Sequence, residues 1–474
     1  MDKTFIASQI YAKFSYQPTI NQKKIIESLS AYLADDDSSR IFVLNGYAGT
    51  GKTSLIAAVV AALKQSGIRT VLLAPTGRAA KVLSQYAGEK AQTIHKRIYR
   101  ERTDASYQSR FSLGYNNESG AVFIVDEASM IATDTQGDER TIFGSGSLLD
   151  DLMRYVRSGK RCRIMFVGDS AQLPPVGSDC SPALDPASLM PYGDVIYETM
   201  DEVVRQAQTS GILFNATLVR CMLEQDIVAI PRFETDYDDV QSIEGGEFTE
   251  LLQECYDRYG RDETIVITRS NKRANRYNEG IRRNVLCAEE KIESGDMLMV
   301  VKNNYHYTER IEDCPMNFIA NGDIARLKRL RRYEDFYGFR FANAVLSFGD
   351  YDDTEIECKI LLDTIYSESP SLTREQSRRL FDEVERDYTD IGSRIKRFRA
   401  IRENPHFNAV QVKFAYAVTC HKAQGGQWSA VFIDRCLFGD EPMTRDMLRW
   451  LYTAMTRAKE RLYLVNFDER FFAE

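Results

Sequence analysis

The chain has 474 residues, of which 43% are hydrophobic and 27% charged, a balance that is typical of a folded globular protein and argues against a disordered or membrane-embedded one. Its length predicts two large domains with insertions, and its formal net charge of -8 argues against a protein coated in positive charge, so only a local basic track could bind nucleic acid. Because the N-terminus lacks the basic start and continuous apolar stretch of a signal peptide, we expect a cytoplasmic protein with no membrane partner.

The first half of the chain alternates predicted strands with predicted helices. A buried strand at residues 40–45 leads through a glycine-rich turn into an apolar helix that ends near residue 63. Further β-rich runs, each ending in polar residues, follow at 70–76, 121–127 and 162–169. This alternation is typical of an α/β domain with a parallel, doubly wound sheet, whose ligands gather at the C-terminal ends of the strands.

A second α/β domain is predicted from the later part of the chain. Its strand-like runs are 264–270, 413–422, 430–434 and 461–467. Two insertions interrupt the pattern: a short excursion with two strand-like arms, and a longer stretch with a charged helix that we interpret as an accessory domain. The predicted divisions are 1–96 and 120–215 for the first domain, 97–119 for the short insertion, 216–324 and 409–474 for the second domain, and 325–408 for the accessory domain.

Two basic runs lie in or near the accessory domain. Residues 394–402 contain five cations and no acid, and residues 326–332 are also rich in arginine. Such runs form either a solvated face or a nucleic-acid contact, and the sequence leaves both alternatives open.

The glycine-rich turn carries a phosphate-binding motif. Residues 46–53, GYAGTGKT, match G-x-x-x-x-G-K-[ST] between a predicted strand and a predicted helix, which is the context that the motif requires. Gly46, Gly49 and Gly51 let backbone N–H groups surround the phosphates. Lys52 would reach the β and γ phosphates, and Thr53 would ligate magnesium, so the motif predicts ATP and Mg²⁺ as cofactors. The other loop residues assigned to nucleotide binding are Tyr47, Ala48 and Thr50.

Hydrolysis needs a second metal anchor, an activated water and a stabilising cation. Asp126 and Glu127 follow a buried strand, so we expect Asp126 to hold the magnesium and Glu127 to orient or deprotonate the attacking water. Arg205 and Arg457 are the candidate arginine fingers. Without context, a surface salt bridge is the alternative for either arginine. Arg457 could reach the γ-phosphate if the two domains face each other across the nucleotide.

The motifs of the chain resemble, in type and order, those of the superfamily 1B DNA helicases of the RecD, Dda and Pif group. Other P-loop enzymes, such as nucleotide kinases, have no reason to carry the later ones, so the joint order is specific. The matching segments are GYAGTGKT (46–53) for motif I, APTGRAAKVL (74–83) for Ia, TIHKRIY (93–99) for Ib, VDEASM (125–130) for II, VGDSAQLPPVGSD (167–179) for III, NGD (321–323) for IVa, VTCHKAQGGQW (418–428) for V and YTAMTRAKERL (452–462) for VI.

The resemblance implies a fold and further site residues. It implies two RecA-like P-loop domains with a 1B hairpin at 97–119 and a 2B domain at 325–408, for which an SH3-like fold is one candidate. By resemblance, Gln22 reads adenine, Gln172 senses the γ-phosphate, Arg205 is the motif IV arginine, and Gly425 of motif V joins the nucleotide site. The catalytic set is then Lys52, Glu127, Gln172, Arg205 and Arg457.

The resemblance also implies a nucleic-acid partner, namely single-stranded DNA and forked duplex DNA, with movement 5′ to 3′. Residues expected to contact the strand come from both domains and are Pro75, Thr76, Thr93, His95, Thr419, His421 and Lys422. The 97–119 hairpin is either a wedge, with Tyr99, Tyr107, Phe111 or Tyr115 stacked on the parting base pair, or an ordinary exposed hairpin.

Two other functions stay open at this point. One is a single-strand translocase or RNA-directed ATPase that does not separate duplex, and the other is an ATP-gated DNA-binding subunit of a recombination complex. The presence of all the predicted catalytic residues argues against the second. We expect a monomer with replication or repair proteins as partners, and the sequence does not reveal the pathway.

Overall fold

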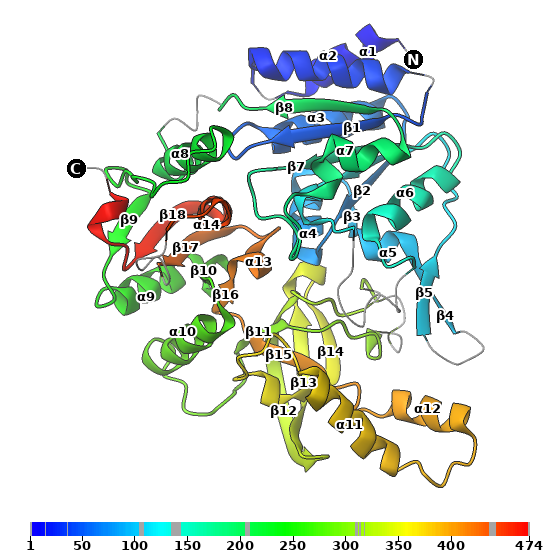
Figure 1. Cartoon of the computed structure of the whole chain (residues 1–474), viewed down its shortest axis with the longest axis vertical. Coiled ribbons are helices and arrows are strands. Elements are labelled where there is room, and N and C mark those ends of the chain that lie inside the picture. The colour runs from blue at the N-terminus through cyan, green and yellow to red at the C-terminus, as the bar shows by residue number, and fades with distance from the viewer. Residues whose placement is uncertain are drawn as a thin grey trace.

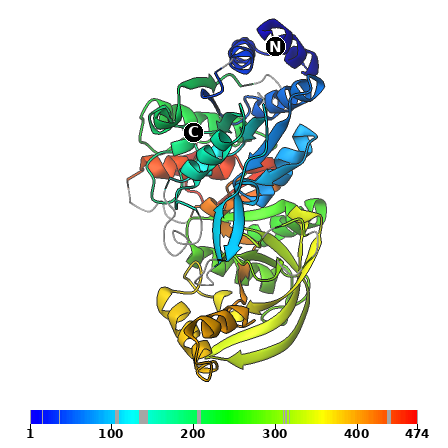
Figure 2. The ribbon, with the colours of Figure 1, turned by 90° about the vertical axis from the view of Figure 1, so that its right-hand side faces the viewer.

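The computed structural model describes residues 2–14, 16–35, 37–103, 109–133, 144–203, 209–308, 311, 314–316, 318–435 and 442–472. In these residues the chain forms two α/β lobes, a closed β-barrel and a short hairpin (Figure 1). The barrel lies at one end of the molecule and the N-terminal helices lie at the other, as the view turned by 90° also shows (Figure 2). None of the described helices combines the length and the apolar character needed to cross a membrane.

The first lobe is built on a six-stranded sheet in the order β3-β2-β6-β7-β1-β8. All neighbouring strands in this sheet are parallel. The strands are β1 (Ile41–Gly46), β2 (Thr70–Ala74), β3 (Ala91–Thr93), β6 (Val122–Val125), β7 (Arg163–Gly168) and β8 (Val195–Met200).

Helices cover both faces of this sheet because its central strands are apolar on both sides. In β1, Phe42 and Leu44 pack against the helices of one face, whereas Ile41 and Val43 pack against those of the other. The first face carries α1 (Lys3–Lys13), α2 (Ile20–Ala34), α3 (Lys52–Gln65) and α4 (Gly77–Ala87), and the second carries α5 (Ile94–Ile98), α6 (Leu148–Ser158) and the short α7 (Pro186–Leu189).

The second lobe has a five-stranded parallel sheet in the order β16-β10-β17-β18-β9. Its strands are β9 (Val240–Ile243), β10 (Thr264–Thr268), β16 (Ala417–Thr419), β17 (Trp428–Asp434) and β18 (Ala458–Val465). Its helices are α8 (Gly211–Glu224), α9 (Phe248–Tyr259), α10 (Asn271–Asn284), α13 (Cys420–Ala423) and α14 (Arg445–Met455). The two parallel sheets confirm the predicted fold class. Helix α8 spans the predicted domain boundary at 215/216 and packs on α14 of the second lobe.

A closed barrel of five strands, β11-β12-β13-β14-β15, projects from the second lobe. Its strands are β11 (Met297–Val300), β12 (Ile324–Phe336), β13 (Phe339–Phe348), β14 (Thr354–Leu361) and β15 (Val410–Phe414). Because β11 and β15 close the barrel, this unit extends beyond both ends of the 325–408 range. Helices α11 (Arg374–Arg386) and α12 (Arg394–Glu403) cover one side of it, packing Leu380, Val384 and Ile401 against Phe341.

The 97–119 range contains an antiparallel hairpin of β4 (Tyr99–Thr103) and β5 (Ser109–Leu113). Tyr99 is buried, and its hydroxyl donates to Asp151 Oδ2 at 2.8 Å, so Tyr99 cannot stack on a base pair in this position. Tyr115 is 82% exposed. The predicted tip residue Tyr107 and the side chain of Phe111 lie outside the described residues.

Candidate nucleotide site and nucleic-acid interface

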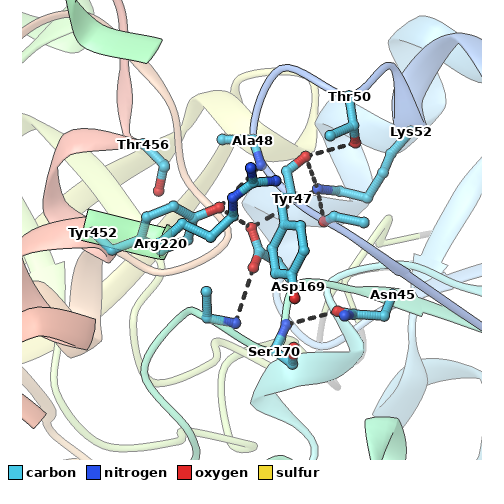
Figure 3. Close-up of polar contacts among 12 residues, drawn as sticks. Asn45, Tyr47, Ala48, Thr50, Lys52, Asp169, Ser170, Arg220, Tyr452 and Thr456 are labelled. Atoms are coloured by element: carbon cyan, nitrogen blue, oxygen red, sulfur yellow. Dashed lines mark hydrogen bonds and ion pairs between the residues drawn. The ribbon is translucent and has the colours of Figure 1, made fainter. Parts of the chain in front are cut away.

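The phosphate-binding loop joins the end of β1 to the start of α3. Its turn depends on Gly49 and Gly51, which have φ values of +73° and +88° that side chains rarely adopt. Lys52 folds back over this loop: its Nζ donates to the carbonyl oxygens of Gly46 and, at 2.9 Å, of Tyr47 (Figure 3). The same Nζ lies 3.9 Å from Asp169 Oδ2. The ammonium group of Lys52 therefore lies against the backbone of the loop.

Gln22 supports the loop from behind. Its Nε2 donates to the carbonyl oxygen of Thr50 at 2.9 Å, and its Oε1 accepts from the backbone N–H of Thr19 at 3.0 Å as half of a capping box. The side chain is buried and does not line the cleft described below. Both ends of its amide are bonded to protein, so its role toward adenine stays a prediction.

A cleft of about 690 Å³ separates the two lobes at this loop. Most of the predicted nucleotide-site residues line it. From the first lobe these are Tyr47, Ala48, Gly49, Gly51, Lys52, Thr53, Asp126, Glu127 and Gln172, and from the second lobe they are Gly425 and Arg457. Gly46 and Thr50 belong to the loop but do not line the cleft. Arg205 lies outside the described residues.

The paired acids sit at the floor of this cleft, directly after β6. Burial, together with the charge of Glu127, raises the pKa of Asp126 to about 6. The hydroxyl of Tyr86 donates to Oδ2 of Asp126, and the N–H of Glu127 donates to Oδ1 at 2.9 Å. Glu127 itself adopts a left-handed backbone conformation, with φ +50°, at the strand end. Asp126 is thus held in place by two donors while Glu127 faces the cleft.

Arg457, from the second lobe, lines the same part of the cleft as the two acids. It is 2% exposed, and its Nη1 lies 3.7 Å from Glu127 Oε1. Its own lobe fixes the guanidinium: Nε donates to Thr453 O at 3.1 Å, and Nη1 donates to Gly426 O at 3.2 Å. The predicted acid and the predicted arginine finger therefore face each other across the lobe interface.

Gln172 contributes a buried acceptor to the cleft. Its side chain is 5% exposed, and its Oε1 has no hydrogen-bond partner among the residues that the structure describes. Leaving such an acceptor unpaired costs about 1–3 kcal/mol. A cleft lined by an unpaired acceptor, a lysine, a buried arginine and two carboxylates fits a magnesium-bound triphosphate and the water that attacks it.

Tyr452 of α14 links the two lobes next to this site. Its hydroxyl donates to Asp169 Oδ2 at 2.7 Å and accepts from the backbone N–H of Ala48 at 3.0 Å (Figure 3). The adjacent Thr453 accepts from the N–H of Leu173 at 2.8 Å. One turn of α14 is therefore bonded both to the phosphate loop and to the segment that follows β7.

A second hollow of about 690 Å³, here called the strand groove, crosses both lobes and borders the barrel. Arg78 of α4 lies 4.1 Å above the ring of Trp428 and donates to Gln427 O at 2.8 Å, so the two lobes also meet here. Burial lowers the pKa of Lys422 to about 8. The residues that line the groove include Thr76, Arg78, Lys272, Thr419, His421, Lys422 and Trp428.

Comparisons with known proteins match each lobe separately. The AAA domain family matches residues 21–220, and the UvrD-like helicase C-terminal domain family matches residues 414–465. The ATP-dependent RecD2 DNA helicase of Deinococcus radiodurans is 31% identical over 159 residues, which are 34% of this chain and 19% of that protein. These matches support the predicted resemblance to the RecD, Dda and Pif group of superfamily 1B helicases.

One further relative and one solved structure align over most of the chain. Uncharacterized protein R530 of Acanthamoeba polyphaga mimivirus is 21% identical, over 95% of this chain and 99% of that protein. A crystal structure of the Pif1 helicase from Bacteroides, in complex with ADP-AlF3 and ssDNA, aligns over 97% of this chain and 95% of that chain, with a TM-score of 0.47 and 14% identity. The chain therefore spans nearly all of the mimivirus protein but about a fifth of the Deinococcus helicase.

The structure brings together four of the seven residues that the superfamily 1B motifs predict to contact DNA. Thr76, Thr419, His421 and Lys422 all line the strand groove. The other three do not line it. Thr93 caps α5 by accepting from the N–H of Lys96 at 3.2 Å, Pro75 is half-buried beside Thr76, and His95 is half-buried against Tyr99 and Phe318. Burial lowers the pKa of His95 to about 4, so its imidazole is neutral near pH 7.

Sequence reasoning missed several residues of this site. Tyr452 precedes Arg457 by five residues in motif VI, but its bond to Ala48 depends on how the lobes pack. Arg220 of α8 stacks over Tyr47 at 4.6 Å, and Tyr16 and Tyr86 also line the cleft. The position of Tyr452 in a recognised motif was an available signal, whereas Arg220 and Tyr16 had none.

Proposed function

We propose that the chain is an ATP-dependent DNA helicase that translocates on single-stranded DNA, 5′ to 3′, and separates a forked duplex. The observation that carries the proposal is the pairing of Glu127 with Arg457 across the lobe interface, at 3.7 Å. A hydrolytic site shared between two lobes can change the spacing of those lobes during each cycle, which is what a translocating motor needs.

Six residues of the cleft have a role in this proposal. Lys52 holds the β and γ phosphates, and Thr53 and Asp126 would ligate magnesium, which would neutralise phosphate charge when bound. Glu127 orients the attacking water and accepts its proton, and Gln172 accepts a hydrogen bond from that water through its unpaired oxygen. Arg457 stabilises the charge that develops on the γ-phosphate.

The strand groove supplies the second half of the proposal. Hydroxyl and ammonium groups suit phosphate contacts, which tolerate any base sequence. Thr76 comes from the first lobe, whereas Thr419 and Lys422 come from the second. A strand bound in the groove therefore contacts both lobes, and a change in the spacing of the lobes alters these contacts. The name of the Deinococcus relative, an ATP-dependent RecD2 DNA helicase, supports the same substrate.

Unwinding of duplexes with a 5′ or a 3′ single-stranded tail tests the proposal. The parent protein should unwind the 5′-tailed duplex in the presence of ATP and Mg²⁺, and Lys52→Ala should abolish both unwinding and ATP hydrolysis. Hydrolysis that RNA stimulates more than DNA, without strand separation, would favour an RNA-directed ATPase instead. Hydrolysis by Lys52→Ala at the parent rate would contradict the assigned nucleotide site.

A further inference from the structure

Another hollow, lined mainly by cationic side chains, lies outside the strand groove, near the C-terminal end of α10. It has a volume of about 550 Å³ and is here called the cationic pocket. Its lining residues are Arg276, Glu279, Gly280, Arg283, Lys291, Arg340 and Tyr366. No predicted site residue belongs to this pocket.

Helix α10 connects the strand groove to the cationic pocket. Its buried face, with Ala274, Asn278 and Ile281, packs against the second lobe beside β16 (Figure 1). Its opposite face carries Lys272 in the strand groove and Arg276 and Arg283 in the cationic pocket. Lys272 and Arg283 are eleven positions apart, so this exposed face covers about 16 Å, the length of about five stacked nucleotides.

Hydrogen bonds fix the walls of the pocket. Arg282 forms a buried ion pair with Asp296, at 2.9 and 3.0 Å, and donates to the carbonyl oxygens of Glu290 and Lys291, at 3.0 Å each. These bonds hold the backbone at Lys291 beside the helix. Tyr366 donates to the same Lys291 carbonyl at 2.7 Å. The pocket therefore does not depend on a loop that is free to move away from α10.

The pocket has an excess of unpaired positive charge. Within the described part of the chain, Arg276, Arg283 and Lys291 have no ion-pair partner, and all three are exposed. Arg340 is paired with Asp363 at 2.9 Å, and Glu279 is the acid in the lining. In a chain with a formal net charge of -8, three unpaired cations around one hollow indicate an anionic ligand.

We propose that the cationic pocket is an outer binding site for the phosphates of single-stranded nucleic acid that emerges from the strand groove along α10. This inference rests on the proposed function, because the groove must carry the strand. Tyr366, which is 38% exposed, adds an aromatic face on which a base can stack beside the three cations. The site lengthens the footprint of the protein on the strand without contributing to ATP hydrolysis.

The test is a length series of oligo(dT), with affinity measured by fluorescence anisotropy and salt dependence. The affinity of the parent should rise with length and reach a plateau. The double variant Arg276→Gln/Arg283→Gln should reach its plateau about five nucleotides earlier and bind the longest oligonucleotide roughly threefold to thirtyfold more weakly. Its salt slope on that oligonucleotide should fall by about 1.4, because two phosphate contacts are lost.

Controls separate this inference from the proposed function. The double variant should keep the parent's affinity for the shortest bound oligonucleotide and the parent's ATPase rate with it, which also shows that it is folded. Arg378→Gln/Arg386→Gln on α11 removes the same charge elsewhere and should leave the length series unchanged. An unchanged series in the α10 variant, or an equal loss in the α11 variant, overturns the inference. A parent that binds no oligonucleotide of any length contradicts the proposed function itself.

Discussion

The position of Arg457 is set by residues of its own lobe. Its guanidinium is fixed by the carbonyl oxygens of Thr453 and Gly426 and by the hydroxyl of Thr456 at 3.2 Å. Its contact with Glu127, at 3.7 Å, is longer than the 2.7–2.9 Å or so of a charge-assisted hydrogen bond. The arginine is therefore held by its own lobe and only attracted by the other. Such an arrangement lets a triphosphate replace the carboxylate as its partner without rebuilding the arginine's support.

We expect Lys422 to make strand binding depend on pH. Burial lowers the pKa of its amine to about 8, so the amine is charged below that pH and becomes neutral above it. A bound phosphate favours the charged form, so binding should take up a proton near this pH. We expect affinity for oligo(dT) to fall between pH 7 and pH 9. Lys422→Gln should bind more weakly at pH 7, with a salt slope smaller by about 0.7, and should lose most of this pH dependence.

Anisotropy titrations at pH 7, 8 and 9 measure this effect. Lys413 must be considered as well, because burial and the charge of Lys422 lower its pKa to about 8, although its Nζ donates to Ser367 O. Lys24→Gln, on the exposed side of α2, is the control for removing one lysine and should keep the parent's pH dependence. The assignment is contradicted by a Lys422→Gln variant whose affinity falls with pH as steeply as that of the parent.

At the scale of elements, α14 is the connection between the lobes. Its C-terminal turn carries Tyr452 and Thr453, which bond to the phosphate loop and to Leu173, and Arg457 follows directly after it. The phosphate loop that leads into α3 and the last turn of α14 therefore meet at Ala48. Because the helix is buried along most of its length, a shift at one end moves the other.

The Tyr452→Phe substitution tests this connection. It keeps the ring but removes the hydroxyl that joins Ala48 to Asp169, and it leaves the buried Asp169 without that donor. DNA-stimulated ATP hydrolysis should fall about tenfold, whereas hydrolysis without DNA should change less than about threefold, because the phosphate loop itself is intact. Tyr463→Phe in β18 removes a hydroxyl far from the interface and should change neither rate. Equal losses with and without DNA would show that the hydroxyl has no coupling role.

Sequence patterns predict the contiguous parts of this site and not the distant ones. Residues 46–53 specify their own turn, since glycines and a following helix are neighbours in the chain. Asp126 and Glu127 were identifiable because they end a buried strand. By contrast, the bond between Ala48 and Tyr452 joins residues 404 positions apart, and no local pattern encodes such packing.

The barrel also depends on contacts between distant segments, which local sequence patterns do not predict. The short strands β11 and β15 fall in the ranges 216–324 and 409–474, which the sequence analysis assigns to the second α/β domain. Their hydrogen bonds to each other, pairing Leu298 with Phe414, join segments more than a hundred residues apart and close the barrel instead. The apolar runs at β1, β2, β6, β7, β10 and β17 were predictable from the sequence, whereas β3, β8 and β9 were not predicted.

At the scale of the whole molecule, the nucleotide cleft and the strand groove share one interface. Gly425 lines the cleft, and a Cβ at this position would lie 3.1 Å from the hydroxyl of Thr76, which lines the groove. Gly425 also follows Lys422 by three residues. A movement of the second lobe relative to the first must therefore change both sites together. In the proposed function, this geometry couples ATP hydrolysis to movement along a strand.

The affinity for oligo(dT), measured with and without a saturating non-hydrolysable ATP analogue and Mg²⁺, tests this coupling most directly. We predict that the analogue changes the affinity by roughly fivefold to 150-fold, and that oligo(dT) changes the affinity for the analogue by the same factor, as linkage requires. Arg457→Gln should bind both ligands but lose most of that factor. A parent protein whose affinity for oligo(dT) is the same with and without the ATP analogue would contradict the account.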